Sequence, residues 1–179
     1  MVKIVGIGGS LRSDSYSMQA LHLAAQKVKA LGADVEILDL REMKLPFCDG
    51  GDDYPDYPDV ATLKDTVKQA DGLLLSTPEY HGSVSGVIKN ALDLMGFDEC
   101  SGKVVGALRV LGGQANSNAR NELSRIMRWV HAWVIPEQIA IGQAWNAFEK
   151  DGTLKDEKLA TRFEQFAASL VANTQKLTS

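Results

Sequence analysis

The stretch VKIVGIGGSLRSDSYS, residues 2–17, decides the fold class of this chain. It opens with a short, nearly continuous apolar run at residues 2–7 and passes directly into glycines and serines. Continuous apolarity is typical of a strand buried on both faces of a parallel sheet. Because the run is short and ends in a Gly/Ser loop, it indicates a strand rather than a signal peptide.

Short apolar runs alternate with amphipathic stretches along the rest of the chain. The other runs lie at residues 35–40, 73–75, 104–111 and 139–141. Apolar residues recur at helical spacing between and after these runs, in stripes that contain Leu21, Leu63, Ile88, Met127 and Phe166. Five strands alternating with five helices predict an open α/β sheet covered on both faces.

Composition excludes several classes of protein. The 179 residues are 45% hydrophobic and 23% charged, so we expect one globular domain spanning residues 1–179. The net charge of −4 argues against a general nucleic-acid binder, and no apolar run approaches the ~20 residues of a membrane span. Two cysteines cannot form a disulfide framework or a four-thiolate zinc site, and they are typical of a reducing cytoplasm.

The loop after the first strand has the features of a phosphate site. Gly8 and Gly9 permit a sharp turn and a close approach of the backbone to a ligand. Hydroxyl donors come from Ser10, Ser13, Ser15 and Ser17. A helix beginning near Ser15 would point its free N–H groups at the loop, and Arg12 adds a charged donor. This donor set suits a terminal phosphate monoester, although ordinary turn residues are an alternative interpretation.

Two other phosphate loops fit less well. The dinucleotide fingerprint G-x-G-x-x-G would begin at Gly6 and Gly8, but its sixth position is Leu11. Asp39 does lie near the end of the second apolar run, where a ribose-binding acid would be, so a Rossmann-type dehydrogenase is disfavoured and stays open. The chain contains no Gly-Lys-Ser/Thr triplet of a nucleoside-triphosphatase loop.

The loop after the third run offers a surface for a planar ring. Pro78 stiffens it, Tyr80 provides a flat face, and Gly82 leaves room for close approach. In the strand order 2-1-3-4-5, strands one and three flank the switch point where such folds bind ligands. One ligand with a phosphate on the first loop and a ring on the second would lie across that point.

At these residues the sequence resembles a known family. GSLRSDSYS (residues 9–17) and LLLSTPEYHGSVSGVIKNALD (residues 73–93) are similar to the two signatures of the NADPH-dependent FMN reductase family, often GSxRxxSxN and PEYNxSxxGxLKNAxD. Residues 112–136 resemble its third flavin loop and the helix that follows. The resemblance extends over roughly residues 3–170 and implies a flavodoxin-like three-layer sandwich, with a five-stranded parallel sheet of order 2-1-3-4-5.

The resemblance also implies a function. It indicates an FMN-dependent NAD(P)H oxidoreductase that passes hydride from NADPH or NADH, through FMN, to a quinone, free flavin, azo dye or metal oxyanion. Homodimers or homotetramers in the cytoplasm are the expected assembly and location. The alternative is a flavodoxin-like electron carrier without pyridine-nucleotide activity, although carriers usually have a strongly acidic surface and −4 is modest.

The family's binding residues transfer by position. The implied phosphate ligands are Ser10, Arg12, Ser15 and Ser17. The implied neighbours of the isoalloxazine are Pro78, Glu79, Tyr80, His81, Gly82 and Ser83, with Gly112, Gly113 and Gln114 on its pyrimidine side. Ser17 and His81 stand where the family commonly has Asn. His81 could donate a proton to a reduced quinone, but we favour a backbone role because hydride transfer at a flavin needs no side-chain base.

The remaining chemical groups carry weaker signals. We expect no catalytic side chain and no metal site, because no two histidines have ligand spacing on one helix. Residues 46–59 form an acidic loop without the spacing of a calcium loop, and we interpret it as a mobile surface loop. Its Tyr54 and Tyr57 could cover a flavin or meet a second subunit. Cys48 and Cys100 receive no catalytic role.

Overall fold

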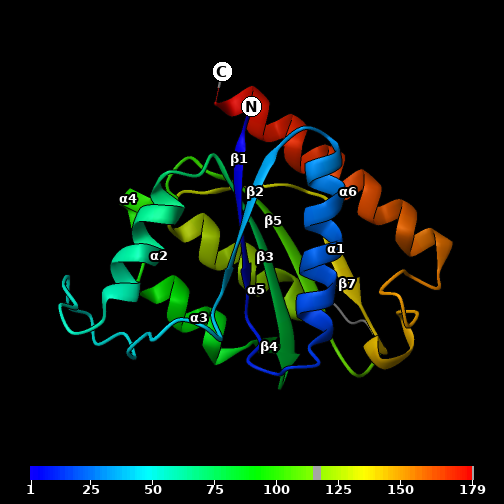
Figure 1. Ribbon diagram of the computed structural model, residues 1–179, viewed down its shortest axis with the longest axis horizontal. Coiled ribbons are helices and arrows are strands. Elements are labelled where there is room, and N and C mark those ends of the chain that lie inside the picture. Colours follow the sequence, from blue (N-terminus) through cyan, green and yellow to red (C-terminus); the bar gives the residue numbers. More distant parts are fainter. Residues whose placement is uncertain (115–117, 179) are drawn as a thin grey trace.

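The computed structural model describes residues 1–114 and 118–178, apart from the side chains of residues 118–120. The strands are β1 (Lys3–Gly8), β2 (Asp34–Asp39), β3 (Gly72–Tyr80), β4 (Ser83–Val84), β5 (Val104–Val110), β6 (Trp133–Val134) and β7 (Ile139–Ile141). The helices are α1 (Tyr16–Ala30), α2 (Pro58–Lys68), α3 (Gly86–Asp93), α4 (Phe97–Cys100), α5 (Asn118–Trp129) and α6 (Glu157–Leu177), with a 3₁₀ turn η1 (Ala144–Asn146). Figure 1 shows α1 and α6 on one side of the sheet, with α2 and α3 on the other.

The sheet has the predicted order. Strands β2, β1, β3 and β5 are neighbours in that sequence, and all three pairs are parallel. The fifth position differs in detail, because it is shared by two short strands, β6 and β7, that pair with successive parts of β5. The flavodoxin-like order 2-1-3-4-5 is therefore confirmed, with β5 as its fourth strand.

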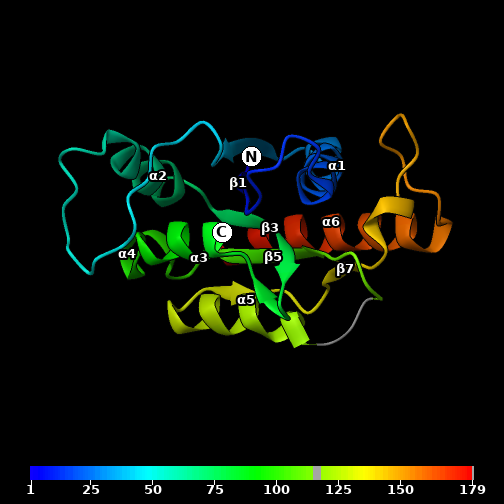
Figure 2. The same ribbon diagram turned by 90° about the horizontal axis from the view of Figure 1, so that it is seen from below.

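Two hydrophobic clusters, one on each face of the sheet, hold the layers together. One is built from α1, α6 and alternate residues of the strands, with Leu21 and Phe166 fully buried. The other joins α2, α3 and α5 to the opposite strand residues, with Leu63 and Ile88 fully buried. Because helices cover both faces of the sheet, the residues on both faces of each central strand are apolar, which explains the continuous apolar runs in the sequence. Figure 2 shows α2 and α3 to the left of the strands, with α1 and most of α6 to the right.

Some predicted boundaries were wrong in detail. The third strand does not end at Leu75 but continues to Tyr80, because residues 76–78 pair with β5 and the last two residues pair with β4 in a hairpin. Val84 therefore belongs to a strand, and the helix that follows begins at Gly86. Within the described part of the chain, no helix is both long and apolar enough to cross a membrane.

Candidate functional site

A cavity of about 380 Å³ opens at the carboxyl ends of β1, β3 and β5. Its lining joins all three loops that the sequence singled out. The lining residues are Ser10, Arg12, Ser15, Tyr16, Ser17, Pro78, Glu79, Tyr80, Val110, Leu111, Gly112, Ala144 and Trp145. The size lies in the usual range of small-molecule sites, and the position is the switch point of the sheet.

The segment between β1 and α1, residues 9–15 and called loop one below, places hydroxyl groups and a cation at the start of α1. The Ser15 hydroxyl caps the helix by accepting a hydrogen bond from the Met18 N–H at 3.2 Å, and it lies 2.9 Å from the Ser17 hydroxyl. Ser10 is 3% exposed, whereas Arg12 is exposed. The positive end of the α1 dipole, the serines and Arg12 together favour an anion here.

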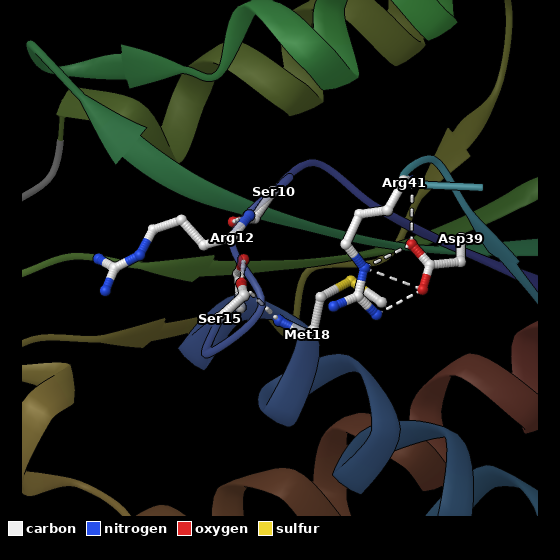
Figure 3. A network of polar contacts seen from close by, with 7 residues as sticks. Ser10, Arg12, Ser15, Met18, Asp39 and Arg41 are labelled. Carbon is white, nitrogen blue, oxygen red and sulfur yellow. Dashed lines mark hydrogen bonds and ion pairs between the residues drawn. The ribbon is translucent and has the colours of Figure 1, made fainter. Parts of the chain in front are cut away.

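Figure 3 shows Arg12 reaching away from a separate ion pair between Asp39 and Arg41. The Arg41 Nε lies 2.8 and 3.0 Å from the two oxygens of Asp39. The backbone N–H of Arg41 also donates a hydrogen bond to the same carboxylate. The Arg41 side chain lowers the pKa of Asp39 below its ordinary value. A ribose diol would therefore have to compete with Arg41 for this carboxylate.

Buried hydrogen bonds fix loop one against the strand and helix that follow. The Gly9 N–H donates to the Ser76 carbonyl at 2.7 Å, and the Ser76 hydroxyl donates to the Ser17 carbonyl at 2.7 Å. The Ser85 hydroxyl, at the N-cap of α3, donates to the Gly9 carbonyl at 2.5 Å. These contacts between distant residues pre-organise the rim of the cavity, and sequence reasoning did not identify Ser76 or Ser85.

The loop after β7 also belongs to the site, although its sequence is undistinctive. The Gln143 N–H donates to the Gly113 carbonyl at 2.8 Å, and the Ala144 N–H donates to the Leu111 carbonyl at 3.1 Å. These bonds bring Trp145, which is 65% exposed, to the mouth of the cavity.

The cavity does not include every residue that the resemblance implied. His81, Gly82, Ser83, Gly113 and Gln114 lie outside its lining. The adjoining residues 115–117 lie outside the described residues.

His81 and Gly82 form the two-residue turn of the β3–β4 hairpin. Tyr80 pairs with Ser83, and the two central residues have φ of 52° and 80°. Positive φ at both positions is the geometry of a type I′ turn, for which Asn-Gly is the preferred pair. The family's Asn at this position is therefore explained by turn geometry, and no proton transfer is needed to account for it.

Replacing His81 with Asn is expected to leave FMN affinity and both half-reactions within about twofold of wild type. It should raise stability by up to ~1 kcal/mol, because Asn tolerates the left-handed conformation better than His. Fluorescence titration, stopped-flow kinetics and thermal unfolding measure these three quantities. His81→Val is the matched control and should destabilise the hairpin. A selective loss of quinone reduction in His81→Asn would instead assign the imidazole an acid role.

The acidic loop lies away from this cavity. Tyr54 donates its hydroxyl hydrogen bond to Asp49 at 2.7 Å, and Tyr54 and Tyr57 line a separate hollow. Asn90 of α3 holds the start of the loop through bonds to Pro46 and Cys48. In this structure neither tyrosine covers the proposed ligand site.

The other cysteine, Cys100, is buried, and burial raises its thiol pKa to about 11, which suits an inert structural residue.

Comparison with known proteins identifies the family. The family model for NADPH-dependent FMN reductases matches residues 2–146. This chain belongs to that family. The FMN-dependent NADPH-azoreductase of Staphylococcus aureus (strain USA300) is 31% identical to this reductase over 170 residues, which cover 92% of this chain and 90% of the relative. The NADPH-dependent FMN reductase ArsH of Shigella flexneri is 29% identical over 178 residues, which cover 97% of this chain and 69% of the relative.

Solved structures agree with this assignment. The flavoenzyme NAD(P)H:(acceptor) oxidoreductase FerB from Paracoccus denitrificans superimposes with a TM-score of 0.82 and 26% identity, covering 98% of both chains. An archaeal flavodoxin, 11% identical with a TM-score of 0.68, covers 97% of this chain and 99% of its own and shares the fold alone. The reductase is thus an FMN-dependent NAD(P)H oxidoreductase, as the resemblance implied. The comparisons give no support to the electron-carrier alternative.

Proposed function

We propose that this reductase holds FMN in the cavity at the carboxyl ends of β1, β3 and β5, within a single domain spanning residues 1–179. The phosphate would lie on Ser10, Arg12, Ser15 and Ser17. The ring would lie along Pro78, Glu79, Tyr80 and Gly112, with His81, Gly82, Ser83, Gly113 and Gln114 acting through backbone positions near its edge. The observation that carries the proposal is the lining itself, because phosphate donors and ring neighbours border one cavity.

When bound, FMN can accept a hydride from NAD(P)H and donate electrons to an acceptor. The residues of this chain would bind and orient the flavin and leave one ring face open. Tyr80 and Trp145 border the cavity and are 49% and 65% exposed. Exposed aromatic side chains favour stacking with another planar ring. This supports planar aromatic acceptors, such as quinones, azo dyes or free flavin, over metal oxyanions.

Steady-state assays with NADPH and FMN-loaded protein test this proposal. We expect menadione, methyl red and free FMN each to be reduced with higher kcat/KM than chromate. The name of the Staphylococcus aureus relative, an azoreductase, makes methyl red an informative member of the panel. A preference for chromate over all three aromatic acceptors would contradict the proposed acceptor class.

We also propose a homodimer, or a homotetramer built from such dimers, that uses the groove between α3, α4 and α5. This groove has a volume of about 510 Å³ and lies away from the proposed flavin site. Trp129 and Phe97, which line it, are 79% and 50% exposed, and an apolar patch of this kind marks an interaction surface. Lys89, Asp93 and Arg125 supply both signs of charge along it, which suits a self-complementary two-fold contact.

Replacing Trp129 with Glu is expected to weaken self-association about 30-fold or more, the size of an interface hot spot. Light scattering coupled to gel filtration would then report a monomer at concentrations where wild type is a dimer or tetramer. Phe47→Glu is the matched control, because Phe47 is 90% exposed and lies outside the groove. An unchanged assembly in Trp129→Glu would exclude this groove as the interface.

We place the reaction in the cytoplasm. Both cysteines are free in the structure, and Cys48 is only half-buried, which is compatible with a reducing compartment. Cell fractionation with an antibody against the native protein tests this location.

A further inference from the structure

A second hollow adjoins the proposed flavin cavity and has no role in the contacts described so far. It has a volume of about 480 Å³, and it shares Tyr16 and Trp145 with the cavity. Its other lining residues are Gln19, Phe148, Glu149, Lys150, Asp151 and Gly152. The hollow therefore lies beside the flavin cavity, between the start of α1 and the segment that follows η1.

The walls of this hollow are fixed by packing and by hydrogen bonds. The rings of Tyr16 and Phe148 stack, with their centroids 6.1 Å apart and an angle of 4° between their planes. In the turn that follows, the Glu149 N–H donates to the Thr153 carbonyl at 2.8 Å, and Gly152 has a φ of 84°. Because these walls are already ordered, a ligand that binds here does not lose free energy by ordering them.

The hollow contains one cation and two carboxylates. The Asp151 carboxylate accepts hydrogen bonds from the backbone N–H and the hydroxyl of Thr153, at 3.0 and 2.6 Å. Glu149 and Lys150 are exposed, and neither takes part in an ion pair within residues 1–114 and 118–178. One carboxylate and one ammonium group are therefore available to a ligand.

These groups fit the adenosine half of a nicotinamide dinucleotide. A purine ring stacks on an aromatic side chain such as Trp145. A ribose hydroxyl donates to a carboxylate such as that of Glu149, and a phosphate binds an ammonium group such as that of Lys150. The position also fits, because the nicotinamide must contact the flavin for hydride transfer. The adenosine half, joined to it through a diphosphate, must then lie beside the flavin cavity.

We propose that this hollow binds the adenosine half of NAD(P)H, with the adenine against Trp145, a ribose hydroxyl on Glu149 and a phosphate on Lys150. The proposal rests on the proposed function, that FMN occupies the neighbouring cavity. It makes Lys150 a specificity residue for the hydride donor.

Reduced nicotinamide mononucleotide tests the subsite in the wild-type protein, because it carries the same nicotinamide but lacks the adenosine half. Stopped-flow measurements of flavin bleaching give the dissociation constant and the limiting rate constant for each donor. NADPH should bind about tenfold or more tightly, the effect of one charge-assisted contact. The limiting rate constants should agree within about threefold, because the lost contact is remote from the reacting atoms. Adenosine 2′,5′-bisphosphate should compete with NADPH and leave reduction by the mononucleotide unchanged.

Reversal of the charge at Lys150 tests the phosphate contact. Lys150→Glu should raise the dissociation constant of NADPH about tenfold and change that of the mononucleotide by less than about twofold. Lys44→Glu is the matched control, because it changes the net charge equally at an exposed position outside both hollows. It should leave the affinity for NADPH unchanged.

NADH separates the two sources of the phosphate. A loss of affinity in Lys150→Glu that is confined to NADPH assigns Lys150 to the 2′-phosphate. An equal loss for NADH assigns it to the diphosphate, and either result supports the subsite.

Failure of this inference is distinguishable from failure of the proposed function. If wild-type protein binds NADPH and the mononucleotide equally well, the subsite does not exist, while FMN binding and the proposed function stand. Wild-type affinity of Lys150→Glu for both NADPH and adenosine 2′,5′-bisphosphate also overturns the inference alone. If the protein binds no FMN, or neither donor bleaches the flavin, the proposed function and this inference fail together.

Discussion

Replacing Arg12 with alanine is expected to weaken FMN binding by ~1.5–3 kcal/mol, the contribution of a charge-assisted hydrogen bond. This corresponds to roughly a 10- to 150-fold higher Kd. Arg12 lines the cavity beside the serines of loop one, and no ion pair to it occurs in the described part of the chain. The fold should survive, because the side chain is exposed and outside the core.

The comparison of FMN with riboflavin makes this test specific for the phosphate. Arg12→Ala should reduce affinity for FMN and leave affinity for riboflavin, which has no phosphate, nearly unchanged. Arg128→Ala removes an exposed arginine from α5 and is the control for net charge. An equal loss of affinity for both flavins would place Arg12 near the ring rather than the phosphate.

Replacing Gly9 with alanine is expected to affect both stability and flavin binding. A Cβ at this position would lie 2.7 Å from Cβ of Ile88 and 2.8 Å from Oγ of Ser85, closer than real contacts allow. Loop one would have to move away from α3, at a cost of roughly 1–3 kcal/mol for overpacking. The Ser85–Gly9 hydrogen bond would be strained as well, so the phosphate donors would lose their alignment.

Thermal unfolding and FMN titration measure the two effects of Gly9→Ala. Gly86→Ala is the matched control, because Gly86 is at the start of the same helix and no atom lies within 4 Å of a Cβ built there. The control should be neutral or slightly stabilising, since alanine has the higher helix propensity. Wild-type stability and FMN affinity in Gly9→Ala would show that this close packing is unimportant.

The alternation of apolar runs and helical stripes was sufficient to predict the sheet, because buried parallel strands and amphipathic helices leave strong periodic signals. The hairpin was harder to predict. Tyr80–His81–Gly82–Ser83 lacks the Asn-Gly pair that marks a type I′ turn, so the sequence predicts a loop here rather than a hairpin. The His-Gly pair is itself a weaker indication of such a turn, since His also adopts positive φ more often than most residues.

Site residues were predictable where they follow a strand within a glycine- and serine-rich motif, as Ser10 and Arg12 do. Trp145 was missed because it reaches the cavity through backbone hydrogen bonds between the loops after β5 and β7. Such pairing between loops leaves no periodic pattern in the sequence.

An anaerobic titration of the FMN-loaded protein with NADPH, followed in the visible spectrum, tests the central claim most directly. The account predicts that the flavin absorption bands bleach on addition of NADPH and return when menadione is added. It also predicts that the cofactor released on denaturation is FMN rather than FAD. Flavin bands that persist in excess NADPH, or a protein that binds no FMN, would contradict the account.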